Sequence, residues 1–270
     1  MQALVQIDVW DAPFAAAGVT DPVRTAATHG DAQRAVPLAS VSKPVTALAV
    51  LIAAEEGTLD LDEPAGPSGS TVRHLLAHAS GLPFHGEVPI AHPGRRRIYS
   101  NQGFGVLGEH LARRAEMPFG DYVRAAVCDP LRLGLDPSGH PGAGMRASLD
   151  DVLAFARELL RPTLVAPETL AEMTSVQFPG LDGVLPEFGR FTPMDWGLGV
   201  EIKGTKPAHW TGELTSPRTF GHFGGSGTFL WVDPERDLAC ACLTTREFGV
   251  WAKEAWPRLS DAVLEELPGR

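Results

Sequence analysis

The sequence predicts an α/β (α+β) fold, in which an antiparallel sheet is flanked by helices and a mostly helical lobe is inserted. Segments that alternate between apolar and polar residues, as strands do, lie near both ends of the chain. Segments with helical periodicity occupy most of the region between them. This order predicts a sheet core of residues 1–59 and 181–270 and an inserted helical lobe of residues 60–180.

Apolar periodicity, capping residues and turn residues set the bounds of the expected elements. Residues 45–54 are almost entirely apolar, which predicts a central, buried helix that Gly57 ends. Ser70 or Thr71 caps a short helix, and residues 148–151 form a capping box. Residues 82–98 have no periodicity and predict a long surface loop, a kind of segment that often carries function. The expected helices are 40–56, 72–80, 103–115, 119–128, 152–160, 167–173 and 251–267, and the expected strands are 3–9, 23–29, 196–202, 208–211, 219–222, 227–233 and 238–244.

The composition is that of an ordinary globular protein with an acidic charge balance. Apolar residues make up 44% of the chain and charged residues 21%, which excludes a disordered protein. The formal net charge of -10 argues against a nucleic-acid partner, and no apolar stretch is long enough for a membrane span. The arginines at 95–97 form the only tight basic run, which we expect to be a solvated loop. The oligomeric state is left open.

Two further observations favour a cytoplasmic protein. The N-terminal residues have neither the basic segment nor the long apolar segment of a secretory signal. Three cysteines, Cys128, Cys240 and Cys242, cannot all pair, and the last two share one face of an expected strand. A reducing compartment fits this pattern best.

Ser40 and Lys43 form a Ser-x-x-Lys motif at the start of the apolar helix. A spacing of three places both side chains on one face of a helical turn. A serine hydroxyl is a poor nucleophile until a neighbouring base takes its proton, and a buried lysine that is partly neutral can be that base. Because the motif also arises by chance, with Ser40 as a helix cap and Lys43 in solvent, its meaning depends on the rest of the chain.

Tyr99 and Asn101 follow the long loop and form a second candidate group. Tyr99 beside a lysine cation would lose its proton more easily, and could act as a general base or protonate a leaving group. Asn101 can hydrogen-bond both Lys43 and a substrate carbonyl or amide. The alternative is structural, with Tyr99 as a loop anchor and Asn101 as a helix N-cap.

A third candidate group lies in the glycine-rich residues 221–227. The backbone N–H of Gly225, paired with that of Ser40, would form an oxyanion hole, and Gly224 permits close backbone approach. His222 would face the same pocket. The alternative is a glycine-rich hairpin with a buried histidine.

Together these motifs resemble those of the serine β-lactamase and penicillin-binding-protein superfamily. The resemblance is to its class C-like branch, which includes β-lactamase-fold esterases and D-aminopeptidases, and it covers nearly the whole chain. The motifs stand here as Ser40-x-x-Lys43, Tyr99-x-Asn101 and His222-x-Gly224, in the family's order. Flanking segments such as VRHLLAHASGLP and YSNQGFGVLGEHLARR match as well. The fold that this implies is β-lactamase/transpeptidase-like.

The resemblance implies a serine hydrolase that forms an acyl-enzyme on Ser40. Lys43 and Tyr99 would transfer the proton of the Ser40 hydroxyl, and either of them could be the general base. Asn101 would position Lys43 and the substrate. His222-x-Gly224 stands where true β-lactamases carry Lys-Thr-Gly, and a histidine is a poorer partner than lysine for a β-lactam carboxylate. We therefore expect a carboxylesterase acting on a small-molecule ester, with a β-lactamase, D-aminopeptidase or peptide amidase as the alternative. No metal or organic cofactor is implied.

Other functions are less favoured by the sequence. Residues 224–228 miss the last glycine of a lipase-type Gly-x-Ser-x-Gly motif, and His74 and His78 lack the glutamate of a zinc metalloprotease motif. An inactive protein that binds peptide or cell-wall fragments is the alternative of another class. Candidate residues for an apolar acyl pocket are Phe84, Phe178, Phe188, Phe191 and Trp196.

Overall fold

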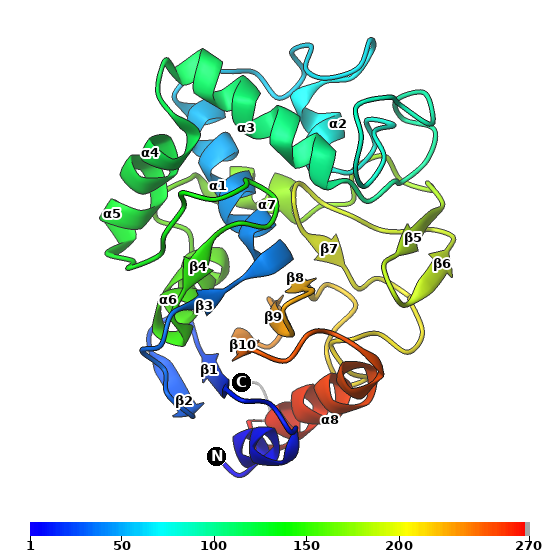
Figure 1. The fold of residues 1–270 in the computed structure, drawn as a ribbon. Coiled ribbons are helices and arrows are strands. Elements are labelled where there is room, and N and C mark those ends of the chain that lie inside the picture. The colour runs from blue at the N-terminus through cyan, green and yellow to red at the C-terminus, as the bar shows by residue number, and fades with distance from the viewer. Residues whose placement is uncertain (268–270) are drawn as a thin grey trace.

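The computed structural model describes residues 1–267, and a six-stranded antiparallel sheet lies at its centre (Figure 1). The strand order across the sheet is β2-β1-β10-β9-β8-β7. Its strands are β1 (Ala15–Thr20), β2 (Thr25–His29), β7 (Glu201–Ile202), β8 (Phe220–Gly224), β9 (Thr228–Asp233) and β10 (Leu238–Thr244). Two short sheets pair β3 (Val36–Pro37) with β4 (Arg146–Ala147), and β5 (Gly183–Leu185) with β6 (Gly189–Phe191).

Helices cover both faces of the large sheet. In Figure 1 the helices between residues 42 and 173 lie on one side of β8, β9 and β10, and α8 lies on the other side beside the N-terminal helix. The helices are η1 (Ala3–Val9), η2 (Ala39–Val41), α1 (Ser42–Glu55), α2 (Val72–Leu76), α3 (Asn101–Ala115), α4 (Phe119–Val123), a π-helical turn (Arg124–Cys128), α5 (Asp129–Leu131), α6 (Leu149–Leu160), α7 (Pro167–Met173) and α8 (Val250–Glu266). None of the helices within residues 1–267 combines the length and the apolar character that crossing a bilayer requires.

The alternation of side chains along the strands separates two apolar clusters. In β10, Ala239, Ala241 and Leu243 face a cluster that includes residues of α1, α3 and α6. Cys240 and Cys242 face the opposite cluster, which includes residues of η1 and α8. The first cluster draws residues from both sides of the boundaries at 60 and 180, and the division into two lobes stays a proposal.

The expected fold class is confirmed, and most expected helices are present. The capping box at the start of α6 is formed as predicted, with the Ser148 side chain accepting from the Asp151 N–H. Thr71 rather than Ser70 caps α2, and Ser100 rather than Asn101 caps α3. The segment after α2 turns away from the helix at His78, whose φ is 54°. His74 and His78 therefore do not share one helix.

Some expected strands are wrong. Residues 3–9 form the 3-10 helix η1, because Leu4 and Ile7, three residues apart, are the side chains that pack inward. The strand expected over 196–202 is reduced to β7, since Gly199 adopts a φ of 76° and bends the chain. Residues 208–211 form no strand. The alanine-rich β1 and the β5–β6 hairpin were not expected.

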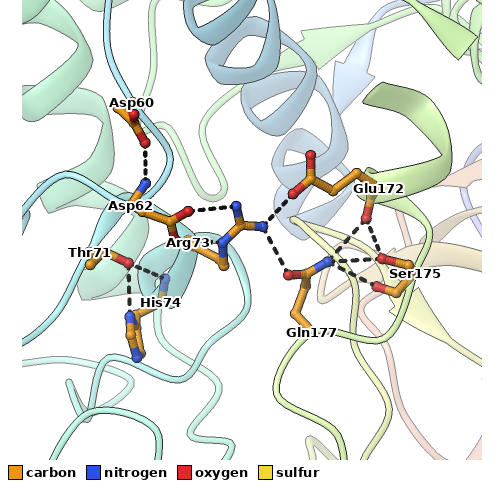
Figure 2. A network of polar contacts seen from close by, with 8 residues as sticks. All are labelled: Asp60, Asp62, Thr71, Arg73, His74, Glu172, Ser175 and Gln177. Atoms are coloured by element: carbon orange, nitrogen blue, oxygen red, sulfur yellow. Dashed lines mark hydrogen bonds and ion pairs between the residues drawn. The ribbon is translucent and has the colours of Figure 1, made fainter. Parts of the chain in front are cut away.

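Arg73 connects three segments that lie far apart in the sequence (Figure 2). Its guanidinium donates to both carboxylate oxygens of Asp62, at 2.8 and 3.0 Å, and on its other side to Glu172 and Gln177, at 2.6 and 3.1 Å. Figure 2 places Arg73 between these groups, so it fixes the segment after α7 against α2. His74 bonds instead to Thr71, with Nδ1 2.9 Å from the hydroxyl.

Arg97 corrects the expectation that residues 95–97 form a solvated basic loop. Its side chain is buried, and its guanidinium donates to the backbone carbonyls of Ala77, Gln177 and Met194, at 2.6 to 3.1 Å. Burial lowers the pKa of Arg97 to about 10, which still leaves it charged at neutral pH. The three carbonyls hold the strand-like segment that leads to Tyr99.

Candidate active site

Ser40 lies in the short turn η2 that leads directly into α1. The residue before it, Ala39, has a φ of 47°, a left-handed conformation that is costly for alanine and aims the turn toward β8. A Cβ placed on Gly224 would lie 2.5 Å from the carbonyl oxygen of Leu38. Glycine is required at 224 because the end of β8 packs directly on the turn that carries Ser40.

Lys43, the second residue of α1, is fully buried and contacts Ser40. Its Nζ lies 3.1 Å from the Ser40 Oγ, 2.7 Å from the Asn101 Oδ1 and 2.7 Å from the carbonyl oxygen of Gly142. No carboxylate within residues 1–267 forms an ion pair with this lysine. Burial therefore lowers the pKa of Lys43 well below its ordinary value of 10.5.

Tyr99 approaches Ser40 from the opposite side. Its hydroxyl donates to the Ser40 Oγ at 2.6 Å, and the Lys43 Nζ lies 4.6 Å from the centre of its ring. Burial raises the pKa of the Tyr99 hydroxyl above its ordinary value of 10, and Glu201 adds to this increase. This direction is opposite to the easier proton loss expected from the sequence, because the burial of the Tyr99 hydroxyl itself is the largest influence on its pKa.

His222 on β8 lies behind Tyr99. Its Nδ1 lies 2.6 Å from the carbonyl oxygen of Phe223, which fixes the proton on Nδ1 and leaves Nε2 as an acceptor. The Tyr99 hydroxyl lies 3.4 Å from that Nε2. Burial, and then repulsion from Lys43, lowers the pKa of His222 to about 3, so the imidazole is neutral at physiological pH.

A cavity of about 330 Å³ opens above Ser40. Its lining residues come from the long loop, the β5–β6 turn, β7, β8 and the segment before α8: Ser40, Phe84, Tyr99, Leu185, Pro186, Glu187, Trp196, Glu201, His222, Phe223, Gly225, Glu247 and Phe248. Gly225 is fixed by its carbonyl oxygen, which accepts from the Phe248 N–H at 2.9 Å. The cavity thus has the nucleophile candidate at its base and aromatic walls.

Four of the seven candidate residues line this cavity, and the other three lie directly behind its lining. Ser40, Lys43, Tyr99, Asn101 and His222 form one connected network, Gly225 lines the cavity, and Gly224 packs on the Ser40 turn.

Of the proposed pocket aromatics, Phe84 and Trp196 line the cavity, whereas Phe178 stacks on His74 with ring centres 4.4 Å apart. Phe188 packs on Phe223 and Phe248 behind the wall.

The sequence analysis missed several functional groups. Gly142 contributes only a carbonyl oxygen, which no side-chain motif reveals. Glu187, Glu201 and Glu247 line the cavity from three separate segments, and their convergence depends on the tertiary fold. Within residues 1–267 no cluster of histidine, cysteine, aspartate or glutamate is arranged to hold a metal ion.

Comparison with known proteins assigns the chain to a family. The model of the Beta-lactamase family matches residues 9–264. The chain belongs to the Beta-lactamase family. A crystal structure of a beta-lactamase from Mycobacterium bovis is 53% identical, with a TM-score of 0.97, over 98% of this chain and 99% of that one.

More distant similarities extend to proteins with other names. Penicillin-binding protein 4* from Bacillus subtilis is 26% identical over 182 residues, which is 54% of this chain and 40% of that protein. The chain thus spans less than half the length of this curated relative. A hydrolase with promiscuous acyltransferase activity, 19% identical, shares the fold with a TM-score of 0.79 over 97% of this chain and 96% of that one. The protein is a Beta-lactamase-family hydrolase, and the family membership alone does not assign its substrate.

Proposed function

We propose that the protein is a carboxylesterase that forms an acyl-enzyme on Ser40. The observation that carries this proposal is the environment of Lys43. A neutral amine has two N–H donors and one lone pair, and two carbonyl oxygens, those of Asn101 and Gly142, lie 2.7 Å from its Nζ. Once these accept the two N–H groups, the lone pair is left for the Ser40 hydroxyl at 3.1 Å. This arrangement supports Lys43 as the general base.

In the acylation step, the Ser40 Oγ attacks the ester carbonyl carbon and its proton passes to Lys43. The Ser40 and Gly225 N–H groups would hold the oxyanion of the tetrahedral intermediate. Tyr99, which burial keeps protonated, lies 2.6 Å from the Ser40 Oγ and would protonate the departing alcohol as the bond to it breaks. The proton on Lys43 then replaces the one that Tyr99 gave up.

Deacylation would use the same groups in reverse. Water attacks the acyl carbon, gives its proton to the network, and releases the acid and the Ser40 hydroxyl. His222, neutral and with Nε2 facing the Tyr99 hydroxyl, would orient that hydroxyl without changing its own charge. Asn101 would hold Lys43 in place.

An ester is favoured over a β-lactam or a peptide with a free carboxylate because the cavity wall carries no lysine or arginine. A peptidase is the second candidate, and it is favoured by the similarity, 24% identity over 199 residues, to a protein from Salmonella enteritidis described as a D-alanyl-D-alanine carboxypeptidase. Ester turnover compared with peptide and penicillin turnover decides between these reactions.

The proposal is tested by covalent labelling with a fluorophosphonate. The wild-type protein is expected to gain the mass of one phosphonate on the peptide that contains Ser40, and to hydrolyse a short p-nitrophenyl ester. Ser40→Ala is expected to lose both the adduct and the turnover, because it removes the hydroxyl that Lys43 and Tyr99 both contact. Intact-protein and peptide mass spectrometry measure the adduct.

The control for this test is the fold of the variant. Circular dichroism and thermal unfolding of Ser40→Ala should match those of the wild type, since alanine is tolerated in this turn. Turnover that persists in the variant contradicts the mechanism. Folded wild-type protein that gives no adduct and no turnover with esters, peptides or penicillin would instead indicate an inactive binding protein.

Tyr99→Phe tests the proposed proton donor. Removing the hydroxyl is expected to lower kcat for an alkyl ester such as ethyl butanoate about 100-fold, because the departing alkoxide then lacks the proton donor positioned at the Ser40 Oγ. The KM should change little. Tyr122→Phe is a matched control, because its hydroxyl bonds to Glu56 outside the cavity. Steady-state kinetics that place Tyr99→Phe within threefold of the wild type would exclude the role.

A further inference from the structure

We propose that this cavity selects ester or amide substrates that carry a positive charge, and that Glu187 and Glu247 provide the selection. The inference rests on the proposed hydrolysis at Ser40 and adds the class of substrate. The group that the cavity would bind is a quaternary or primary ammonium, attached either to the acyl group or to the leaving group of the substrate.

The charged residues of the cavity wall are all acidic. Glu187 lies in the β5–β6 turn, Glu201 in β7 and Glu247 in the segment before α8, and none of the other lining residues is a lysine or an arginine. Glu187 and Glu247 are exposed, and within residues 1–267 neither carboxylate has an ion-pair partner. Their charges are therefore available to a ligand at the mouth of the cavity.

The third carboxylate is held differently. Glu201 accepts from the Trp210 indole N–H at 2.6 Å, and Lys206 and His209 lie 3.3 and 3.0 Å from its Oε1. Lys206 largely balances the charge of Glu201. Glu201 therefore contributes less to the negative electrostatic potential in the cavity than the two exposed glutamates. Lys253 lies beside the mouth but outside the lining: it donates to the backbone carbonyl of Glu187 and lies 5.6 Å from the centre of the Phe188 ring.

Burial weakens the positive charge that could oppose a cation at the base of the cavity. It lowers the pKa of Lys43, which disfavours the charged amine, and Lys43 does not line the cavity. The pKa of His222 is lowered to about 3, mainly by burial, so the imidazole is neutral at physiological pH and adds no repulsion for a cationic substrate. A substrate carboxylate, in contrast, meets two unpaired carboxylates at the mouth and no compensating cation on the wall.

Aromatic rings provide the second, independent observation. Phe84, Tyr99, Trp196, Phe223 and Phe248 line the cavity beside the carboxylates. The faces of such rings attract ammonium groups, most strongly where water is excluded. Aromatic walls with acidic residues at the rim are suited to an apolar cation.

The experiment compares three esters of equal shape and different permanent charge. They are the p-nitrophenyl esters of 4-(trimethylammonio)butanoate, 5,5-dimethylhexanoate and 4-sulfobutanoate, which carry a positive, a neutral and a negative end group. The wild type is expected to favour the cationic over the neutral ester about tenfold in kcat/KM, and the neutral over the anionic ester by a similar factor. Added salt should reduce both factors, because the two glutamates are exposed.

The double variant Glu187→Gln/Glu247→Gln is expected to bring the cationic-to-neutral ratio down to about twofold, the part left to the aromatic rings. The double variant Glu168→Gln/Glu265→Gln is a matched control. It changes the net charge by the same amount at two exposed glutamates that do not line the cavity, and should keep the ratio of the wild type. Butyrylthiocholine and S-(3,3-dimethylbutyl) thiobutyrate repeat the comparison with the charge on the leaving side.

A binding measurement separates this inference from the proposed function. Ser40→Ala is titrated with benzyltrimethylammonium and with benzenesulfonate by calorimetry. Binding of the cation alone, lost in the Glu187→Gln/Glu247→Gln background, supports the inference even in a protein that hydrolyses no ester. Turnover of the esters with equal rates, or with preference for the anionic ester, together with no cation binding, overturns the inference and leaves the hydrolase proposal intact.

Discussion

Replacing Lys43 by methionine is expected to lower kcat/KM for a p-nitrophenyl ester about 1,000-fold, because it removes the proposed general base from the Ser40 hydroxyl. Methionine has a similar length and no lone pair that can take the proton. The buried site tolerates an uncharged side chain, since burial already disfavours the charged lysine. Stopped assays at high enzyme concentration measure the residual rate.

The pH profile gives the same experiment a second readout. Only the neutral amine can accept the serine proton, so kcat/KM of the wild type should rise with pH through the lowered pKa of Lys43 and then level off. His222, with a pKa of about 3, adds no step above pH 5. The step should be absent in Lys43→Met. A step that persists in Lys43→Met, or a variant whose kcat/KM is within tenfold of the wild type, contradicts the assignment.

Lys203→Met is a matched control for the loss of a buried lysine. The Lys203 Nζ bonds to the Thr215 carbonyl and hydroxyl at 2.6 and 2.8 Å, and Lys203 does not line the cavity. Its replacement is expected to lower the free energy of unfolding and to leave kcat/KM nearly unchanged. A loss of rate in both variants would point to general destabilisation as the cause.

The sequence was sufficient to predict the fold class and the network around Ser40 because these depend on local signals. The apolar residues 45–54 define a helix that is buried on every face, and short motifs place Ser40 and Lys43 within one turn. Strands β9 and β10 are short, mostly apolar segments with a clear turn between them, and both formed as expected. Local chemistry of this kind is visible without the tertiary structure.

The missed features depend on contacts between distant segments. β1 consists mainly of small residues with little preference for strands, and its pairing with β10 makes it a strand. Arg97 is buried because three carbonyl oxygens from separate segments surround it, which no local pattern indicates. The pKa directions of Lys43 and Tyr99 likewise depend on burial, so the sequence could not decide between them as bases.

Glu201→Gln is expected to lower the free energy of unfolding by about 3 kcal/mol, because it leaves the buried Lys206 ammonium without its carboxylate. The glutamine oxygen can still accept from the Trp210 or the His209 N–H. The decrease in the free energy of unfolding therefore comes mainly from the loss of the negative charge beside Lys206. Urea unfolding at pH 7 measures it. Glu187→Gln is the matched control, an exposed glutamate on the same cavity, and should change the free energy of unfolding by less than about 0.5 kcal/mol.

The double variant Glu201→Gln/Lys206→Met and the pH dependence complete this test. Removing both charges should cost less than the sum of the single changes, because no buried charge is then left unpaired. Burial alone would raise the pKa of Glu201, but His209, Lys206 and Trp210 outweigh it and hold the pKa at about 2, below its ordinary value of 4.5. The carboxylate therefore stabilises the fold above pH 4.5, and this contribution disappears as the pH falls toward 2. The difference in the free energy of unfolding between the wild type and Glu201→Gln should therefore shrink as the pH falls over that range. A difference that stays constant from pH 7 to pH 3 would contradict an ionised Glu201.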